Sequence, residues 1–132
     1  MNIQLCDSRV QSLNISRSVE AKDTDGEIVH FATKFGFKPD LENNYFICFE
    51  LVVETPCGSS VDVQYESMFY TDEIISEEFQ SSPFAMINSP AIAYPFLRAY
   101  ISTLLTLSGL ESVVLPTINF QAMYKDHKPT NN

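Results

Sequence analysis

The chain has 132 residues, a formal net charge of −9 at pH 7, and a composition that is 45% hydrophobic and 12% aromatic. This length predicts a single domain over residues 1–132, with enough apolar side chains for a substantial core. The negative charge disfavours nucleic acid and anionic membrane surfaces as partners, because both would repel the chain, and it favours basic or unfolded polypeptides.

The cysteines and histidines give little sign of metal or redox chemistry. Cys6, Cys48 and Cys57 are an odd number without CxxC spacing, and no signal peptide opens the sequence. This pattern predicts reduced thiols and a cytoplasmic location. His30 and His127 are too isolated to complete a zinc site with these thiols, so we expect neither a metal nor a cofactor.

Residues 3–16 are expected to form a first strand in which the apolar phase changes. Ile3 and Leu5 share one phase, Val10 has the other, and Leu13 and Ile15 return to the first. Such a change predicts either a bulge or two strand halves that face different layers.

Three further strands are expected, separated by polar turns. Residues 21–27 form a turn with an Asp-Gly step, and residues 29–37 then alternate as a half-buried strand. After a second turn at residues 39–44, residues 45–55 are apolar on both faces, which predicts a central strand. Residues 61–69 alternate again after a short hairpin loop, so strands two to four should form an antiparallel meander.

A helix of about twenty residues is expected between Ser89 and Gly109. Ser89 is a good N-cap, Pro90 suits the first turn, and Gly109 is a ready C-cap. The apolar residues cover more than one side, which a single four-stranded sheet does not bury. We therefore expect a homo-oligomer with residues 93–107 in the interface, and a tetramer is the favoured state over a dimer. Pro95 predicts a kink or a re-started helix one turn from the beginning.

A membrane span is the alternative to this helix, and the sequence disfavours it. Pro95, Arg98 and several hydroxyl side chains interrupt the apolar run, and no basic cluster flanks it. We expect no insertion into a membrane.

The segments on either side of the long helix carry apolar side chains at unusual places. Residues 72–79 predict a short acidic helix or turn, and residues 81–88 predict a crossover loop, which carries Phe84, Met86 and Ile87. Beyond the helix, residues 111–119 are expected to be extended, and Asn119 is expected to cap a short helix over residues 120–127. That helix presents Phe120, Met123 and Tyr124 on one side, and residues 125–132 are expected to be frayed.

The motifs of the common enzyme classes are missing. The sequence has no Gly-rich phosphate loop, no GxSxG and no HExxH, and its acidic residues fall singly or in pairs typical of solvated faces. Cys48 paired with His30 across neighbouring strands is conceivable as a nucleophile, but a buried structural thiol is the favoured interpretation. We therefore expect that the protein is not an enzyme. The surplus apolar surface indicates a protein that binds hydrophobic segments or itself, and composition alone does not separate a binding surface from a core with a dimer interface.

One part of the sequence combines several specific residues. It has the aromatic-proline-aromatic step Tyr94, Pro95 and Phe96, then Arg98, a helix that ends in Gly109, and a closing run made of Leu115, Pro116, Ile118, Asn119 and Phe120. This combination resembles the SecB family of protein-export chaperones. Residues 61–70, VDVQYESMFY, look like the fourth strand of that family, so the resemblance covers residues 3–124.

The resemblance implies an α+β fold with a four-stranded antiparallel sheet, followed by one long helix and a short C-terminal helix. Family members assemble as dimers of dimers, and they bind non-native polypeptide in grooves between the crossover, the sheet and the terminal helix. The residues that map to this groove are Phe84, Met86, Ile87, Phe120, Met123 and Tyr124. In the long helix, the expected oligomer interface includes Leu97, Tyr100, Ile101 and Leu104.

The sequence also departs from the members that serve secretion. Those members dock the translocation ATPase SecA through acidic residues on the outer sheet face and through a C-terminal tail. Asp62 matches one such acid, but Asn14 stands where another is expected, and the tail DHKPTNN is short. These departures count against SecA docking.

The function that the resemblance implies is that of a cytoplasmic, ATP-independent holdase, which keeps aggregation-prone polypeptides unfolded. The alternative is a dedicated chaperone or control module for one partner, such as the antitoxin of a toxin–antitoxin system.

Overall fold

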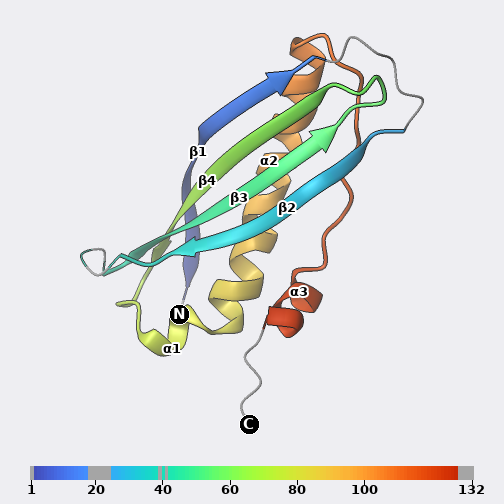
Figure 1. Cartoon of the computed structure of the whole chain (residues 1–132). Coiled ribbons are helices and arrows are strands. Elements are labelled where there is room, and N and C mark those ends of the chain that lie inside the picture. Colours follow the sequence, from blue (N-terminus) through green and yellow to red (C-terminus); the bar gives the residue numbers. More distant parts are fainter. Residues whose placement is uncertain (1, 18–24, 39, 41, 128–132) are drawn as a thin grey trace.

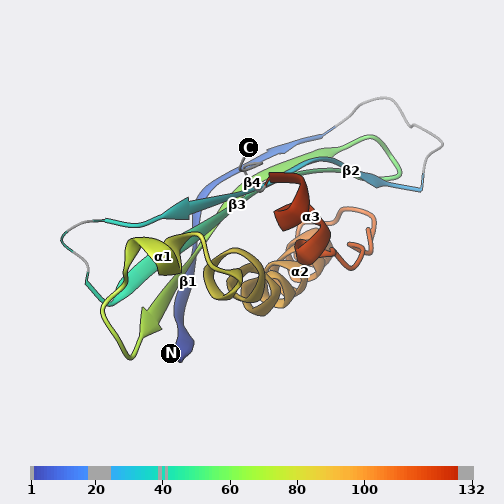
Figure 2. The ribbon, with the colours of Figure 1, turned by 90° about the horizontal axis from the view of Figure 1, so that it is seen from below.

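The computed structural model describes residues 2–17, 25–38, 40 and 42–127. Four strands come first along the chain, β1 (Ile3–Ser16), β2 (Glu27–Gly36), β3 (Asn44–Glu54) and β4 (Ser60–Thr71), and the helical segments follow (Figure 1). These segments are α1 (Glu77–Gln80), η1 (Phe84–Asn88), α2 (Ser89–Leu107) and α3 (Phe120–His127). The expected α+β architecture is confirmed, and Figure 2 shows α2 and α3 together on one face of the sheet.

The sheet is antiparallel throughout, with the strand order β1-β4-β3-β2. The predicted meander of strands two to four is therefore confirmed, and β3 is a central strand as its two-sided apolar pattern indicated. The side chains that β3 and β4 turn toward the helices form the core, and among them Tyr45, Phe49 and Phe69 are fully buried. No described helix lies on the opposite face of the sheet (Figure 2), so that face is open in the part of the chain that the structure describes.

The phase change in β1 has its cause in two bulges. The register with β4 shifts between Leu5 and Asp7, and again between Val10 and Ser12. Each shift inserts one extra residue, so Val10 pairs with Tyr65 and returns to the face on which Leu5 lies. All the apolar residues of β1 thus share the helix-side face. Of the two explanations left open by the sequence, the bulge is correct, and strand halves that face different layers are not found.

The crossover predicted at residues 81–88 is helical and not a loop. η1 (Phe84–Asn88) is a turn of π-helix that runs directly into α2. The amide of Ser89 donates to the carbonyl of Phe84, and the Ser89 hydroxyl donates to the same oxygen at 3.0 Å. The prediction of Ser89 as an N-cap is therefore wrong, because its hydroxyl is used within a continuous helix and in a hydrogen bond with the hydroxyl of Tyr45. Pro90 supplies no amide proton, which favours a widened turn at this position.

The face of α2 that lies on the sheet is a simple four-residue repeat. Ala93, Leu97, Ile101 and Leu105 are buried against β3 and β4. The helix runs through Pro95 without interruption, so the re-started helix that we considered there is not found. Gly109, with φ of +71°, ends the helix as predicted. None of the helices in the described ranges is both long and apolar enough to cross a bilayer.

The segment between α2 and α3 returns along the molecule without regular secondary structure. Val113 and Leu115 are buried in the core, which fixes its path. Asn119 then caps α3 as predicted, because its side-chain oxygen accepts from the amide of Ala122 at 3.0 Å. Residues 125–127, which were expected to be frayed, are the last residues of α3, and residues 128–132 lie outside the described residues.

Candidate functional site

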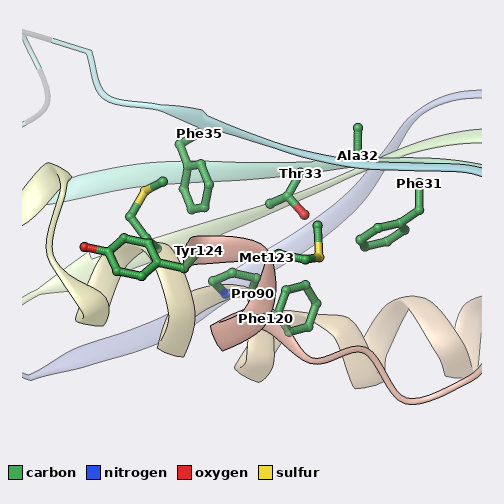
Figure 3. Close-up of a pocket in the computed structure, with 9 residues that line it drawn as sticks. Phe31, Ala32, Thr33, Phe35, Pro90, Phe120, Met123 and Tyr124 are labelled. Atoms are coloured by element: carbon green, nitrogen blue, oxygen red, sulfur yellow. The ribbon is translucent and has the colours of Figure 1, made fainter. Parts of the chain in front are cut away.

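A groove of about 350 Å³ lies between the edge strand β2 and the helix α3. On the β2 side it is lined by Phe31, Thr33 and Phe35, which are two residues apart and point to the same side of the sheet (Figure 3). Ala32 also lines the groove, although its side chain points to the other side, so it contributes through its main chain. An edge strand has a row of backbone amides and carbonyls that no neighbouring strand pairs with. The groove therefore runs beside a free strand edge.

The helical side of the groove comes from three separate segments. Met86 belongs to η1, Pro90 to the first turn of α2, and Phe120, Met123 and Tyr124 to α3. In Figure 3 the side chain of Met123 points toward Thr33 across the groove, and the ring of Tyr124 extends along it. All nine lining residues are uncharged, so the site is suited to apolar and neutral groups.

Aromatic contacts at its first residue hold α3 in place. The ring of Phe120 lies 5.7 Å from that of Tyr94, 6.2 Å from that of Phe49 and 6.3 Å from that of Phe31, measured between ring centroids. Tyr94 in turn donates its hydroxyl to the carbonyl of Pro116 at 2.7 Å, and burial raises the pKa of that hydroxyl. The beginning of α3 is thus part of the core, whereas Met123 is only half-buried over the groove.

A second contact holds the other side of α3. The hydroxyl of Tyr124 donates to the carbonyl of Ser81 at 3.0 Å, just before η1. This bond links α3 to the crossover that carries Met86. Two contacts thus hold α3 against the rest of the groove, the Tyr124 hydrogen bond and the packing of Phe120.

The structure brings together four of the six residues expected to form the groove. Met86, Phe120, Met123 and Tyr124 line it, whereas Phe84 and Ile87 do not. Phe84 is half-exposed outside the groove, and Ile87 packs against the core, because the π-turn directs successive side chains to different sides.

Sequence reasoning missed the β2 residues Phe31, Thr33 and Phe35. Their alternation was noted as a half-buried strand, but nothing in the sequence placed that strand at the edge beside α3. The free edge is a property of the strand order alone.

A second apolar surface lies where the helix-side face of β1 extends past α2, and we call it the β1–α2 surface. On β1 it includes the partly exposed side chains of Val10, Leu13 and Ile15. On α2 it includes Ile92, Phe96, which is 52% exposed, and Leu107, which is 80% exposed. The ring of Tyr100 connects the two elements, since it lies 5.6 Å from the ring of Tyr65, the partner of Val10.

The residues expected in an oligomer interface fall into two groups. Tyr100 and Leu104 are half-buried and border the β1–α2 surface. Leu97 and Ile101 are fully buried against the sheet of their own chain, so they have no surface left for a partner. The helical repeat predicts one common face for Leu97, Tyr100, Ile101 and Leu104. The sheet covers only the part of that face that holds Leu97 and Ile101.

The outer face of the sheet holds the residues considered for other roles. Asp62 is exposed and lies directly opposite Asn14 in the pairing of β4 with β1. Cys48 pairs with Lys34, whereas His30 pairs with Val52, four residues further along β3. At about 3.3 Å per residue, this separation excludes contact between the thiol and the imidazole.

Charges around Cys48 also oppose a nucleophilic role. Burial raises the pKa of the Cys48 thiol, and the nearby carboxylates of Glu66 and Glu50 raise it further. The ammonium of Lys34 lowers this pKa by less than the other groups raise it, and it forms an ion pair with Glu50 at 3.0 Å. Within the described ranges, no group of three or more His, Cys, Asp or Glu side chains is placed to hold a metal ion.

Comparisons of the sequence with known proteins point to one family. The family model described as "Preprotein translocase subunit SecB" matches residues 14–131. The protein-export protein SecB of Methylibium petroleiphilum is 44% identical over 46 residues, which cover 35% of this chain and 28% of that protein. The SecB of Jannaschia sp. is 25% identical over 96 residues, 67% of this chain and 55% of that protein. The matches thus span about half the length of these relatives or less.

Solved structures show the same fold. A SecB-like chaperone of Mycobacterium tuberculosis, in complex with a ChAD peptide from an antitoxin, superposes with a TM-score of 0.69 at 15% identity, over 88% of this chain and 89% of that one. A protein of unknown function from Streptococcus agalactiae superposes with a TM-score of 0.54 at 12% identity, over 89% of this chain and 98% of that one. Because the family model matches nearly the whole chain and the fold agrees, this chain belongs to the SecB family.

Proposed function

We propose that this protein is an ATP-independent chaperone that binds non-native polypeptide in the groove between β2 and α3. The observation that carries the proposal is an uncharged, aromatic-lined groove beside a free strand edge, in a chain of the SecB family. An extended client segment of about ten residues would add to the edge of β2 through main-chain hydrogen bonds, with alternate side chains in the groove.

The composition of the groove supports binding of varied clients. Met86 and Met123 have flexible side chains that repack around different shapes, whereas Phe31 and Phe35 supply rigid aromatic surface. The net charge of −9 favours clients with basic residues outside the groove. The three free thiols are consistent with a reducing, cytoplasmic environment, which is part of the proposal.

A second candidate is a dedicated chaperone for one partner, such as an antitoxin. It is favoured by the superposition on the M. tuberculosis chaperone that holds an antitoxin peptide. The outer face of the sheet favours it as well, because the residue opposite Asp62 is the neutral Asn14 and not a second acid. We therefore infer that SecA is not docked through an acidic pair on this face.

Self-association is the remaining part of the proposal. The β1–α2 surface has exposed Phe, Leu, Ile and Val side chains along two adjacent elements. Single exposed apolar side chains are common on protein surfaces, whereas a group of this kind indicates a contact with another molecule. We infer a homo-oligomer that buries this surface, with a dimer of dimers as the expected state.

The test is suppression of aggregation with several unrelated unfolded proteins, compared between the wild type, Met123→Asp and Gln121→Asp. Met123→Asp places a charge in the uncharged groove, and Gln121→Asp places the same charge on the exposed side of α3. The wild type and Gln121→Asp should protect all clients, and Met123→Asp should protect none. Protection of a single client by the wild type would favour the dedicated chaperone, and full protection by Met123→Asp would refute the groove.

A further inference from the structure

The side chain of Thr33 is in an unusual position for a hydroxyl group. Its Oγ1 atom is buried and has no hydrogen-bond partner among the described residues, and no other side-chain oxygen or nitrogen described there shares this state. Buried polar side chains in folded proteins almost always have a partner, so an exception calls for an explanation. A valine would fill the same space without leaving an oxygen unpaired.

The location of Thr33 supplies the explanation. Thr33 lines the groove, and Figure 3 shows its side chain pointing into the groove, between Phe31 and Phe35 along β2. The other lining residue with a polar side-chain group is Tyr124, on the opposite side of the groove, and its hydroxyl already donates to the carbonyl of Ser81. The remaining side chains of the groove are apolar. The side chains that line the groove therefore supply no partner for Oγ1, and a segment bound in the groove supplies one when the side chains that cover this atom move aside.

The three β2 side chains set a spacing. Phe31, Thr33 and Phe35 lie two residues apart in a strand, which is about 7 Å between neighbours. An extended segment beside β2 has the same repeat, so it places alternate side chains opposite these three. Cross-strand pairs of hydroxyl side chains are close enough to form hydrogen bonds.

We propose that Thr33 is a specificity-determining residue of the groove. The extended segments that it selects have a hydroxyl or carboxamide side chain at a central position and an apolar side chain two residues before and two residues after it. This inference rests on the proposed function and names the segment that the groove prefers. The Thr33 hydroxyl both donates and accepts, so Ser, Thr, Asn and Gln satisfy it. Asp, Glu, Lys and Arg at the central position are rejected, because the uncharged groove offers no compensation for a buried charge.

The test uses the full chain and two fluorescent peptides that differ only at the central position. Both have phenylalanine two residues to either side of the centre and lysines at the ends, and the centre is threonine in one and valine in the other. By fluorescence anisotropy, the wild type should bind the threonine peptide about 3- to 10-fold more tightly, as expected for one hydrogen bond between neutral groups.

Two substitutions at Thr33 complete the experiment. Thr33→Val keeps the shape and removes the hydroxyl, so the preference should disappear or reverse in favour of the valine peptide. Thr33→Ser keeps the hydroxyl and should retain the preference for threonine.

Equal affinity of the wild type for both peptides overturns the inference, and so does an unchanged preference in Thr33→Val. The first comparison needs no variant, so a Thr33→Val that did not fold would still leave the inference refutable. If the wild type bound neither peptide, the proposed function itself would fail, whereas tight binding of both with equal affinity would refute only the role of Thr33.

Discussion

The hydroxyl of Tyr45, inside the sheet, forms a hydrogen bond with the hydroxyl of Ser89, at the point where η1 becomes α2. Tyr45 is fully buried, and the Ser89 hydroxyl also donates to the carbonyl of Phe84. Two residues 44 positions apart are thereby joined, and through them the sheet fixes the turn that carries Met86 to the groove.

The first prediction concerns this link. Ser89→Ala leaves the buried Tyr45 hydroxyl without its partner and removes one of the two hydrogen bonds to the Phe84 carbonyl, so it should lower the free energy of unfolding by about 1–3 kcal/mol. In Tyr45→Phe the Ser89 hydroxyl keeps its hydrogen bond to the Phe84 carbonyl, so this change should cost less, about 0.5–1.5 kcal/mol. Urea denaturation of both single variants and the double variant measures the coupling. Additive effects of the two changes would contradict a shared hydrogen bond.

The second prediction concerns alkaline pH. Burial raises the pKa of Tyr45 above its usual value, and it also raises the pKa values of Tyr94 and Tyr100. The folded state then keeps a phenolic proton that the unfolded state loses above about pH 10. This contribution to stability is complete below that pH and is lost as pH rises toward the folded pKa values. Urea midpoints should therefore fall above pH 10, and less steeply in Tyr45→Phe. Equal slopes in the two proteins would count against a raised pKa at Tyr45.

The third prediction concerns assembly. Phe96→Asp places a charge in the β1–α2 surface and should convert the oligomer to smaller species in sedimentation velocity. Val114→Asp is the matched control, because Val114 is 85% exposed in the segment after α2 and lies in neither apolar surface. It should sediment like the wild type. A wild type that is monomeric at micromolar concentration would refute the interface.

The fourth prediction concerns the crossover. Phe84→Ala with Met86→Ala should weaken capture of an unfolded client, with little change in melting temperature, because Phe84 is half-exposed and Met86 is only half-buried. Two core residues would instead cost about 2–5 kcal/mol each. Ile74→Ala, which removes an exposed apolar side chain outside the groove, should leave both measurements unchanged. A large loss of stability with client binding intact would show that the crossover is core and not client surface.

The sequence by itself determined the features that depend on neighbours along the chain. The meander follows from two alternating runs with a run that is apolar on both faces between them, all joined by short turns. The end of α2 follows from Gly109, where the backbone needs a positive φ. The cap of α3 follows from the side chain of Asn119. At both of these helix ends the deciding residue lies within a few positions of the backbone that it serves, and in the meander each strand pairs with the next one along the chain, so nearby sequence is sufficient.

The tertiary structure alone decided what covers each apolar face. Periodicity assigned Leu97 and Leu104 to one helix face, but the sheet covers Leu97 completely and leaves Leu104 only half-buried. In the same way, Ser89 has the local chemistry of an N-cap, and the distant hydroxyl of Tyr45 draws it into the core instead. Phe31 and Thr33 line a groove only because β2 is the last strand of the sheet and α3 stops beside it. A sequence pattern specifies which side chains point the same way, and packing between distant segments specifies what they meet.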